Sequence, residues 1–212
     1  MLEPFPPIDA VLRGMVVALL LLAAGLMLRD RPRLPAAQAG ALLCFGLVVQ
    51  VFSSTPSFEQ RVSCTAQAPL VGISVANAVL FWLVVRTLFD DDFHRPWHAA
   101  VWVLALAIGA SNCAMVSCAP AWVTVLLRVL LRAVPVAGAM LAIYATARHW
   151  RDDLVETRRR LRLFVLVTGV AYTLMQLGLR LNAPQGRLDS GAALLDMAGL
   201  LLITVGAVWQ LA

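Results

Sequence analysis

Seven long apolar segments, separated by loops that carry arginine, account for nearly all of this 212-residue sequence. A segment of about 18 or more apolar residues can cross the roughly 30 Å hydrocarbon core of a bilayer as a helix. A helix also pairs all its own backbone polar groups, as hydrocarbon requires. The sequence therefore predicts an all-α fold, a polytopic seven-helix bundle in a lipid bilayer. The predicted spans are residues 8–28, 36–52, 70–89, 97–115, 121–146, 161–181 and 192–211.

The composition leaves no room for a soluble domain of ordinary size. Hydrophobic residues make up 61% of the chain and charged residues 14%, whereas soluble domains carry about 25% charged residues. We therefore expect one membrane domain over residues 1–212. All 17 basic residues are arginine, and basic loops are what orients a membrane protein, which we favour here over nucleic-acid binding. Residues 1–9 carry acids and prolines rather than basic residues, so we expect no cleaved signal peptide.

Arginine is distributed unequally between the two sides of the predicted bundle. Three loops on one side, residues 29–33, 90–98 and 148–162, hold ten arginines, and Arg86 lies near them. The other side holds Arg13, Arg61, Arg180 and Arg187. Short loops rich in arginine stay in the cytoplasm. The N-terminus is therefore predicted outside and the C-terminus inside.

Charged residues inside predicted spans are the first candidates for a functional site, because charge in a bilayer is costly. Arg128 and Arg132 are four positions apart in the fifth span and share a helix face. Asp196 lies in the seventh span, also in its outer half. We expect Asp196 to pair with one of these arginines and to line a polar cavity that binds a ligand. The alternatives are a structural salt bridge, or arginines that extend to the membrane surface.

Three neutral polar residues extend this candidate ligand site. They are Asn77 in the third span, and Tyr172 and Gln176 in the sixth. We expect all three to face the interior of the bundle. The alternative for each is a hydrogen bond that joins helices and has no role in ligand binding.

Cysteine spacing suggests a disulfide bond rather than a metal site. Cys64, Cys113 and Cys118 fall in or near the outer loops, and Cys44 lies inside the second span. We expect Cys64 to pair with Cys118 or Cys113 on the oxidising side. No metal-ligand spacing and no HExxH, GxSxG, Walker A or Rossmann motif occurs in the sequence. We therefore expect no metal, no cofactor and no enzymatic activity.

Several loop motifs resemble a known bacterial family. They are LRDRPR at residues 28–33, FWL at 81–83, LFDDDF at 88–93, RDDLVE at 151–156 and RRRLR at 158–162. These motifs are similar to those of membrane-bound AraC-type transcriptional regulators, and they fall at matching places in the order of seven spans. In that family a seven-helix module precedes a cytoplasmic helix-turn-helix domain that binds DNA. No helix-turn-helix follows the seventh span in these 212 residues.

The resemblance implies a sensory module in the inner membrane of a bacterium. Its partners would be the bilayer, a small-molecule or envelope signal, the cytoplasmic DNA-binding output and, in a homodimer, a second copy. The signal would act in the outer half of the bundle and reach the output through the last helix. Two alternatives remain open: a stand-alone transporter or carrier, and a structural accessory subunit of the membrane.

Overall fold

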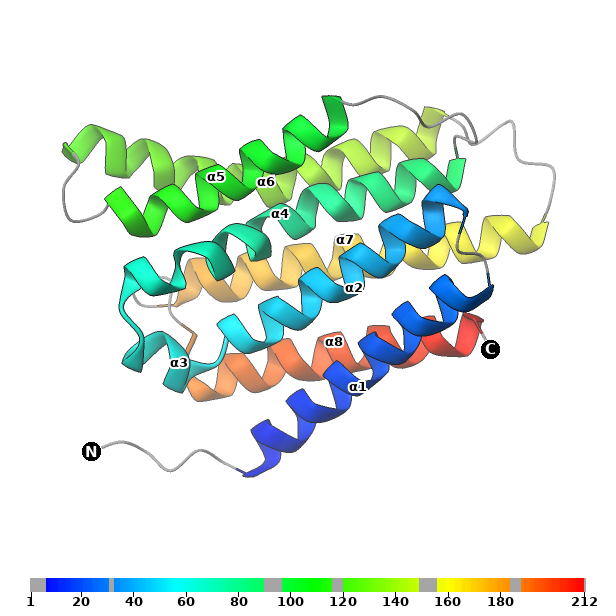
Figure 1. The fold of residues 1–212 in the computed structure, drawn as a ribbon, viewed down its shortest axis with the longest axis horizontal. Helices are drawn as coiled ribbons and strands as arrows, with labels where there is room; N and C mark the ends of the chain where they lie inside the picture. The colour runs from blue at the N-terminus through cyan, green and yellow to red at the C-terminus, as the bar shows by residue number, and fades with distance from the viewer. Residues whose placement is uncertain are drawn as a thin grey trace.

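Every regular element in the described part of the chain is a helix, which confirms the predicted all-α fold. The computed structural model describes residues 7–30, 33–89, 97–115, 120–148, 156–183 and 188–211. In chain order the helices are α1 (Pro7–Asp30), α2 (Pro35–Ser53), α3 (Pro56–Arg61), α4 (Cys64–Phe89), α5 (Trp97–Met115), α6 (Ala121–Arg148), α7 (Glu156–Asn182) and α8 (Ser190–Leu211). The long helices alternate in direction, so α1 begins and α8 ends at opposite ends of the bundle (Figure 1).

The seven predicted segments coincide with the seven long helices, although some helices extend further. α4 begins at Cys64 and α7 at Glu156, rather than at the predicted residues 70 and 161. Hydropathy locates only the apolar part of a helix, which can continue into polar residues beyond it. The short helix α3 was not predicted. It begins with Pro56 directly after the extended residue Thr55, and proline suits the first position of a helix.

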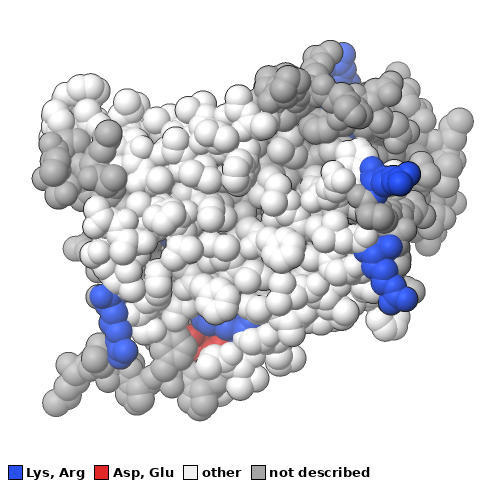
Figure 2. All heavy atoms as spheres, in the orientation of Figure 1, with Lys and Arg blue, Asp and Glu red and all other residues white. Residues whose placement is uncertain are grey.

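The surface of the bundle is that of a membrane protein. Six helices, α1, α2, α4, α6, α7 and α8, contain a segment long and apolar enough to cross a bilayer, and α5 contains the shorter apolar stretch Ala99–Ser111. Large apolar side chains face outward on these helices, for example Met140, Leu202 and Trp209. In Figure 2 most basic side chains in view lie toward the two ends of the bundle. This distribution matches a hydrocarbon core between two polar surfaces.

The interior contains two separate apolar cores. The first core joins α1, α2 and α8, with Val16, Val51 and Met197 fully buried. The second core joins α4, α5 and α6 around Ala76, Val85 and Ala142. α4 packs against α2, α5, α6 and α7. It therefore joins the half of the bundle around the first core to the half around the second core.

Small residues allow the helices to approach α4 closely. A Cβ atom added to Gly109 of α5 would lie 2.7 Å from the Gly72 Cα of α4. A Cβ atom added to Gly138 of α6 would lie 2.7 Å from the backbone oxygen of Ala78, also in α4. Lipid tails are as apolar as side chains, so helix association in a membrane depends on such close packing. Gly178 in α7 is different, because a Cβ atom there would meet nothing within 4 Å.

We predict that Gly138→Ala destabilises the bundle and that Gly178→Ala does not. The new methyl group at residue 138 would press on the α4 backbone, which has to move, at a cost of about 1–3 kcal/mol. At residue 178 the same change adds only helix propensity, worth up to about 1 kcal/mol in favour of the fold. Thermal unfolding of the two variants in the same detergent measures the difference. Equal melting temperatures would contradict the close contact between α4 and α6.

Candidate functional site: a buried polar network

Five polar side chains from four helices form one continuous chain of hydrogen bonds. Asn77 Nδ2 of α4 donates to Gln50 Oε1 of α2 at 3.0 Å. Gln50 Nε2 donates to the Tyr172 hydroxyl of α7 at 3.3 Å. Gln176 Nε2, also in α7, donates to the Tyr172 hydroxyl at 3.0 Å and to Asp196 Oδ1 of α8 at 3.0 Å. We call these five residues the polar network.

The polar network has three buried residues, with Tyr172 and Gln176 half-buried, and it ends at a carboxyl group. Asp196 is 0% exposed, Gln50 4% and Asn77 5%. Asp196 accepts two hydrogen-bond contacts from Gln176 Nε2, at 3.0 Å through Oδ1 and at 3.3 Å through Oδ2. Among the described residues no guanidinium lies within ion-pairing distance of Asp196; the one ion pair there joins Arg13 and Asp9. The neutral amide of Gln176 therefore stabilises the carboxyl group where water and hydrocarbon cannot.

Local helix geometry brings these residues together. Tyr172 and Gln176 are four positions apart and so lie on one face of α7. Asp196 lies four positions before Leu200, which is buried in the first core, so this face of α8 points inward. Asn77 reaches α2 at Gly46, where its amide oxygen occupies the position that a side chain would take. A larger residue at position 46 would therefore separate Asn77 from Gln50.

The polar network lies where the two apolar cores meet. Asn77 follows Ala76 of the second core, and Asp196 precedes Met197 of the first. Tyr172 packs against the first core, whereas Val170, two residues earlier on α7, packs against the second. Hydrogen bonds of the network therefore cross the junction between the two halves of the bundle. A change in the relative position of the halves would alter these bonds.

The structure brings together four of the six predicted ligand-site residues: Asn77, Tyr172, Gln176 and Asp196. The predicted pairing of Asp196 with Arg128 or Arg132 is wrong. Both arginines are exposed on α6, and α6 packs against α4, α5 and α7, whereas Asp196 lies on α8, which packs against α1 and α7. The order of packing around the bundle, which periodicity along one helix does not reveal, separates these charges.

Sequence analysis missed Gln50 and a buried ion pair in α1. Arg13 donates to Asp9 Oδ2 at 2.8 Å, to the Val51 backbone oxygen and to Ser54 Oγ at 3.3 Å. Arg13 therefore neutralises Asp9 and adds a charged donor at the end of α2, where the Val51 oxygen also accepts from the Ser54 and Thr55 hydroxyl groups. A cation at this end of a helix also interacts favourably with the helix dipole. The sequence analysis counted Arg13 among the arginines of the outer side and predicted no partner for it. An acid and a base four positions apart within an apolar segment were the signal for it.

The structure describes the side chains of two of the four cysteines. Cys64 is disulfide-bonded, and Cys44 is free and buried in α2. The side chains of Cys113 and Cys118 lie outside the described residues, so the pairing of Cys64 with either one stays a prediction. In the described part of the chain, no three histidine, cysteine or acidic side chains are grouped so that they could hold a metal ion.

The fold and surface define the class of protein: a multi-pass helical membrane protein with a buried polar network between two apolar cores. Beyond the class, no family model, no curated protein and no solved structure matches this chain. Its function is therefore inferred from its own residues.

We predict that Arg13→Leu strongly destabilises the bundle. The substitution would leave the Asp9 carboxyl group buried without its ion-pair partner, at a cost of about 3–5 kcal/mol. Thermal unfolding in detergent measures the loss. The matched control is Arg61→Leu, which removes an exposed arginine at the same end of the bundle.

A second variant separates the charge from the packing. In Asp9→Leu/Arg13→Leu both charges are absent, and we expect part of the stability to return, because the unpaired carboxyl group is gone. If Arg13→Leu melted at the temperature of Arg61→Leu, the buried ion pair would have no structural role.

Proposed function

We propose that this chain is the membrane-embedded signal-input module of an AraC-type transcriptional regulator in the inner membrane of a bacterium. A signal binds at the polar network and changes the relative position of the two halves of the bundle. α8 transmits this change to a cytoplasmic DNA-binding output. The observation that carries the proposal is the hydrogen-bonded chain from Asn77 to Asp196 across the junction of the two cores.

Buried polar groups within a membrane are costly, and those that persist usually serve a function. The polar network connects α2, α4, α7 and α8, and only α8 leads to the end of this sequence. A signal that bound the network in one arrangement of the helices more tightly than in another would shift their populations. The resemblance of the loop motifs to membrane-bound AraC-type regulators supplies the output that such a shift would control.

Buried polar residues nearer the opposite end of the bundle, where α1 ends, support a sensor better than a transporter. The hydroxyl groups of Thr87, Thr146 and Thr204 each donate to a carbonyl oxygen in their own helix. Within the described residues these threonines form no bonds between helices. A carrier needs polar groups along a path across the whole bilayer, whereas the polar network lies toward the end of the bundle where α1 and α8 begin.

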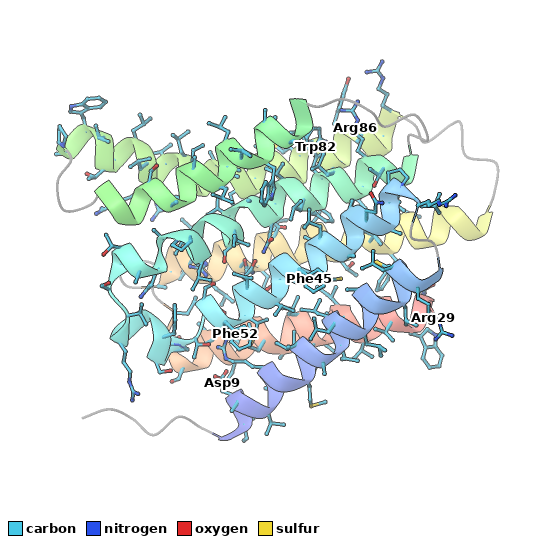
Figure 3. All side chains as sticks on the ribbon, viewed as in Figure 1. Asp9, Arg29, Phe45, Phe52, Trp82 and Arg86 are labelled. Atoms are coloured by element: carbon cyan, nitrogen blue, oxygen red, sulfur yellow. The ribbon has the colours of Figure 1, made fainter. Side chains whose placement is uncertain are left out.

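The proposed topology has seven spans, with the N-terminus outside. Arg29 and Arg86 lie at the end of the bundle opposite Asp9 (Figure 3), and that end would face the cytoplasm by the rule for arginine-rich loops. The polar network would then lie in the outer half, where a signal from the envelope can reach it.

We predict opposite activities for reporter fusions at the two ends. Alkaline phosphatase, which folds only outside the cytoplasm, should be active when fused after Val62 and inactive when fused after Arg33. A fluorescent protein that folds in the cytoplasm should give the reverse result at the same two positions. The opposite pattern would place α8 so that it ends outside, and a cytoplasmic output would then be excluded.

We predict that Asp196→Asn alters signalling while Asp189→Asn does not. The first change replaces the carboxyl group at the end of the polar network with an amide, and a coupling of about 1–3 kcal/mol corresponds to at least about a fivefold shift in the response. Asp189 is exposed and accepts a hydrogen bond from the Ala192 backbone at 2.9 Å, and asparagine caps a helix equally well. Reporter transcription, measured with the chain joined to its DNA-binding output, gives the comparison. An unchanged response of Asp196→Asn under every inducing condition would rule out this site.

A further inference from the structure

α6 is longer than the hydrocarbon core is thick, and its arginines define the part that crosses it. The helix has 28 residues, or about 42 Å at 1.5 Å per residue, against a core of roughly 30 Å. Arg128 and Arg148 are 20 positions apart (148 − 128), which corresponds to about 30 Å along the helix. With Arg148 at one boundary of the hydrocarbon, Arg128 lies at the other and Arg132 about one turn deeper.

The first half of α6 is covered by little of the bundle. The buried residues of α6 are Leu127 and then, from residue 138 onward, Gly138, Ala139, Ala142, Ala145 and Thr146. Arg128 and Arg132 are both exposed, beside the outward-facing Val125 and Val129, which are 59% and 57% exposed. Neither guanidinium has a hydrogen-bond or ion-pair partner within the described part of the chain. Two charges on a membrane-facing surface therefore lack the partners that such charges usually have.

Helix geometry directs both arginines toward the membrane surface. Side chains on a helix lean toward its N-terminus, and α6 begins at the same end of the bundle as α1 (Figure 1). Trp122 lies in the first turn of α6 and is 69% exposed, and tryptophan favours the level of the lipid headgroups. The guanidinium groups thus reach from the edge of the hydrocarbon toward the lipid phosphates.

We propose that Arg128 and Arg132 form a binding site for the phosphate of an anionic phospholipid. The planar guanidinium group donates two parallel hydrogen bonds that match phosphate oxygens, and two such groups one helical turn apart can hold one headgroup between them. The exposed acyl-facing surface around Val125 and Val129 would contact the lipid tails.

Charge complementarity favours a lipid over a second copy of this chain. A second copy would have to offer an acidic side chain to both arginines at this depth. Among the acidic residues at this end whose side chains the structure describes, Asp9 and Asp196 are buried, and Asp189 caps α8 through the Ala192 backbone. The phosphates of the lipids, by contrast, form a continuous layer at the level that the arginines reach.

The test is lipid binding by the purified full chain. The protein is placed in detergent and titrated with phosphatidylglycerol, and bound lipid is counted by native mass spectrometry, with phosphatidylcholine as the neutral comparison. Each arginine near a membrane surface contributes enough for about a fivefold change in affinity. We expect Arg128→Gln and Arg132→Gln each to weaken phosphatidylglycerol binding about fivefold, and the double variant about thirtyfold. Arg61→Gln, which changes an exposed arginine outside the long helices, should bind as the original chain does.

Three outcomes would overturn the proposal. The first is phosphatidylglycerol binding by the double variant that equals that of the Arg61→Gln control. The second is binding of phosphatidylcholine by the original chain that equals its binding of phosphatidylglycerol. The third is a dimer of the original chain in phosphatidylcholine that the double variant loses, because this face would then be a protein interface. Arg128→Lys/Arg132→Lys keeps the charge and tests the lipid site if the glutamine variants fail to fold. The affinity of this lysine variant for phosphatidylglycerol should fall between that of the original chain and that of the single glutamine variants.

Discussion

Polar groups inside the bundle must find their partners within the protein, because hydrocarbon offers no hydrogen bonds. This constraint explains two features that otherwise seem unrelated. Arg13 supplies a buried donor to Asp9 and to the end of α2, and the polar network supplies donors to Asp196. Both features tie α2 to other helices. The position of α2 between the rest of the first core and α4 therefore depends on hydrogen bonds as well as on apolar packing.

Apolar packing around α4 provides the rigid part of the molecule. The contacts at Gly72, Gly109 and Gly138 bring α5 and α6 against the α4 backbone with little room for movement. The first core joins the second through α2, which packs closely on α4, and through α7. Under the proposed function, a change in the relative position of the two cores would therefore have to act through these two helices.

α6 combines two environments along one helix. Its second half packs on α4 through small residues, and its first half exposes two arginines among apolar side chains. A phosphate held at Arg128 and Arg132 would fix the level of α6 in the bilayer, at the same end of the bundle as the polar network. The composition of the membrane could in this way influence the helices that the proposed signal moves.

The sequence by itself determined the helices. A helix in hydrocarbon is stabilised by its own backbone bonds, so its place depends on a local run of apolar residues, and the predicted segments match the seven long helices closely. Asn77, Tyr172, Gln176 and Asp196 were also recognisable, since polar residues stand out in apolar segments. Gln50 stands out in the same way, but nothing in α2 alone indicated which helix it would face.

Only the tertiary structure decided the partners. Asp196 bonds with Gln176 instead of an arginine of α6, because α8 packs beside α7 and α1. Arg13 is buried because the end of α2 lies against α1. Periodicity fixes the face of a helix on which a residue lies, whereas the order of helices around the bundle depends on contacts between residues far apart in the chain. The hydrogen bonds of the polar network are set by that order.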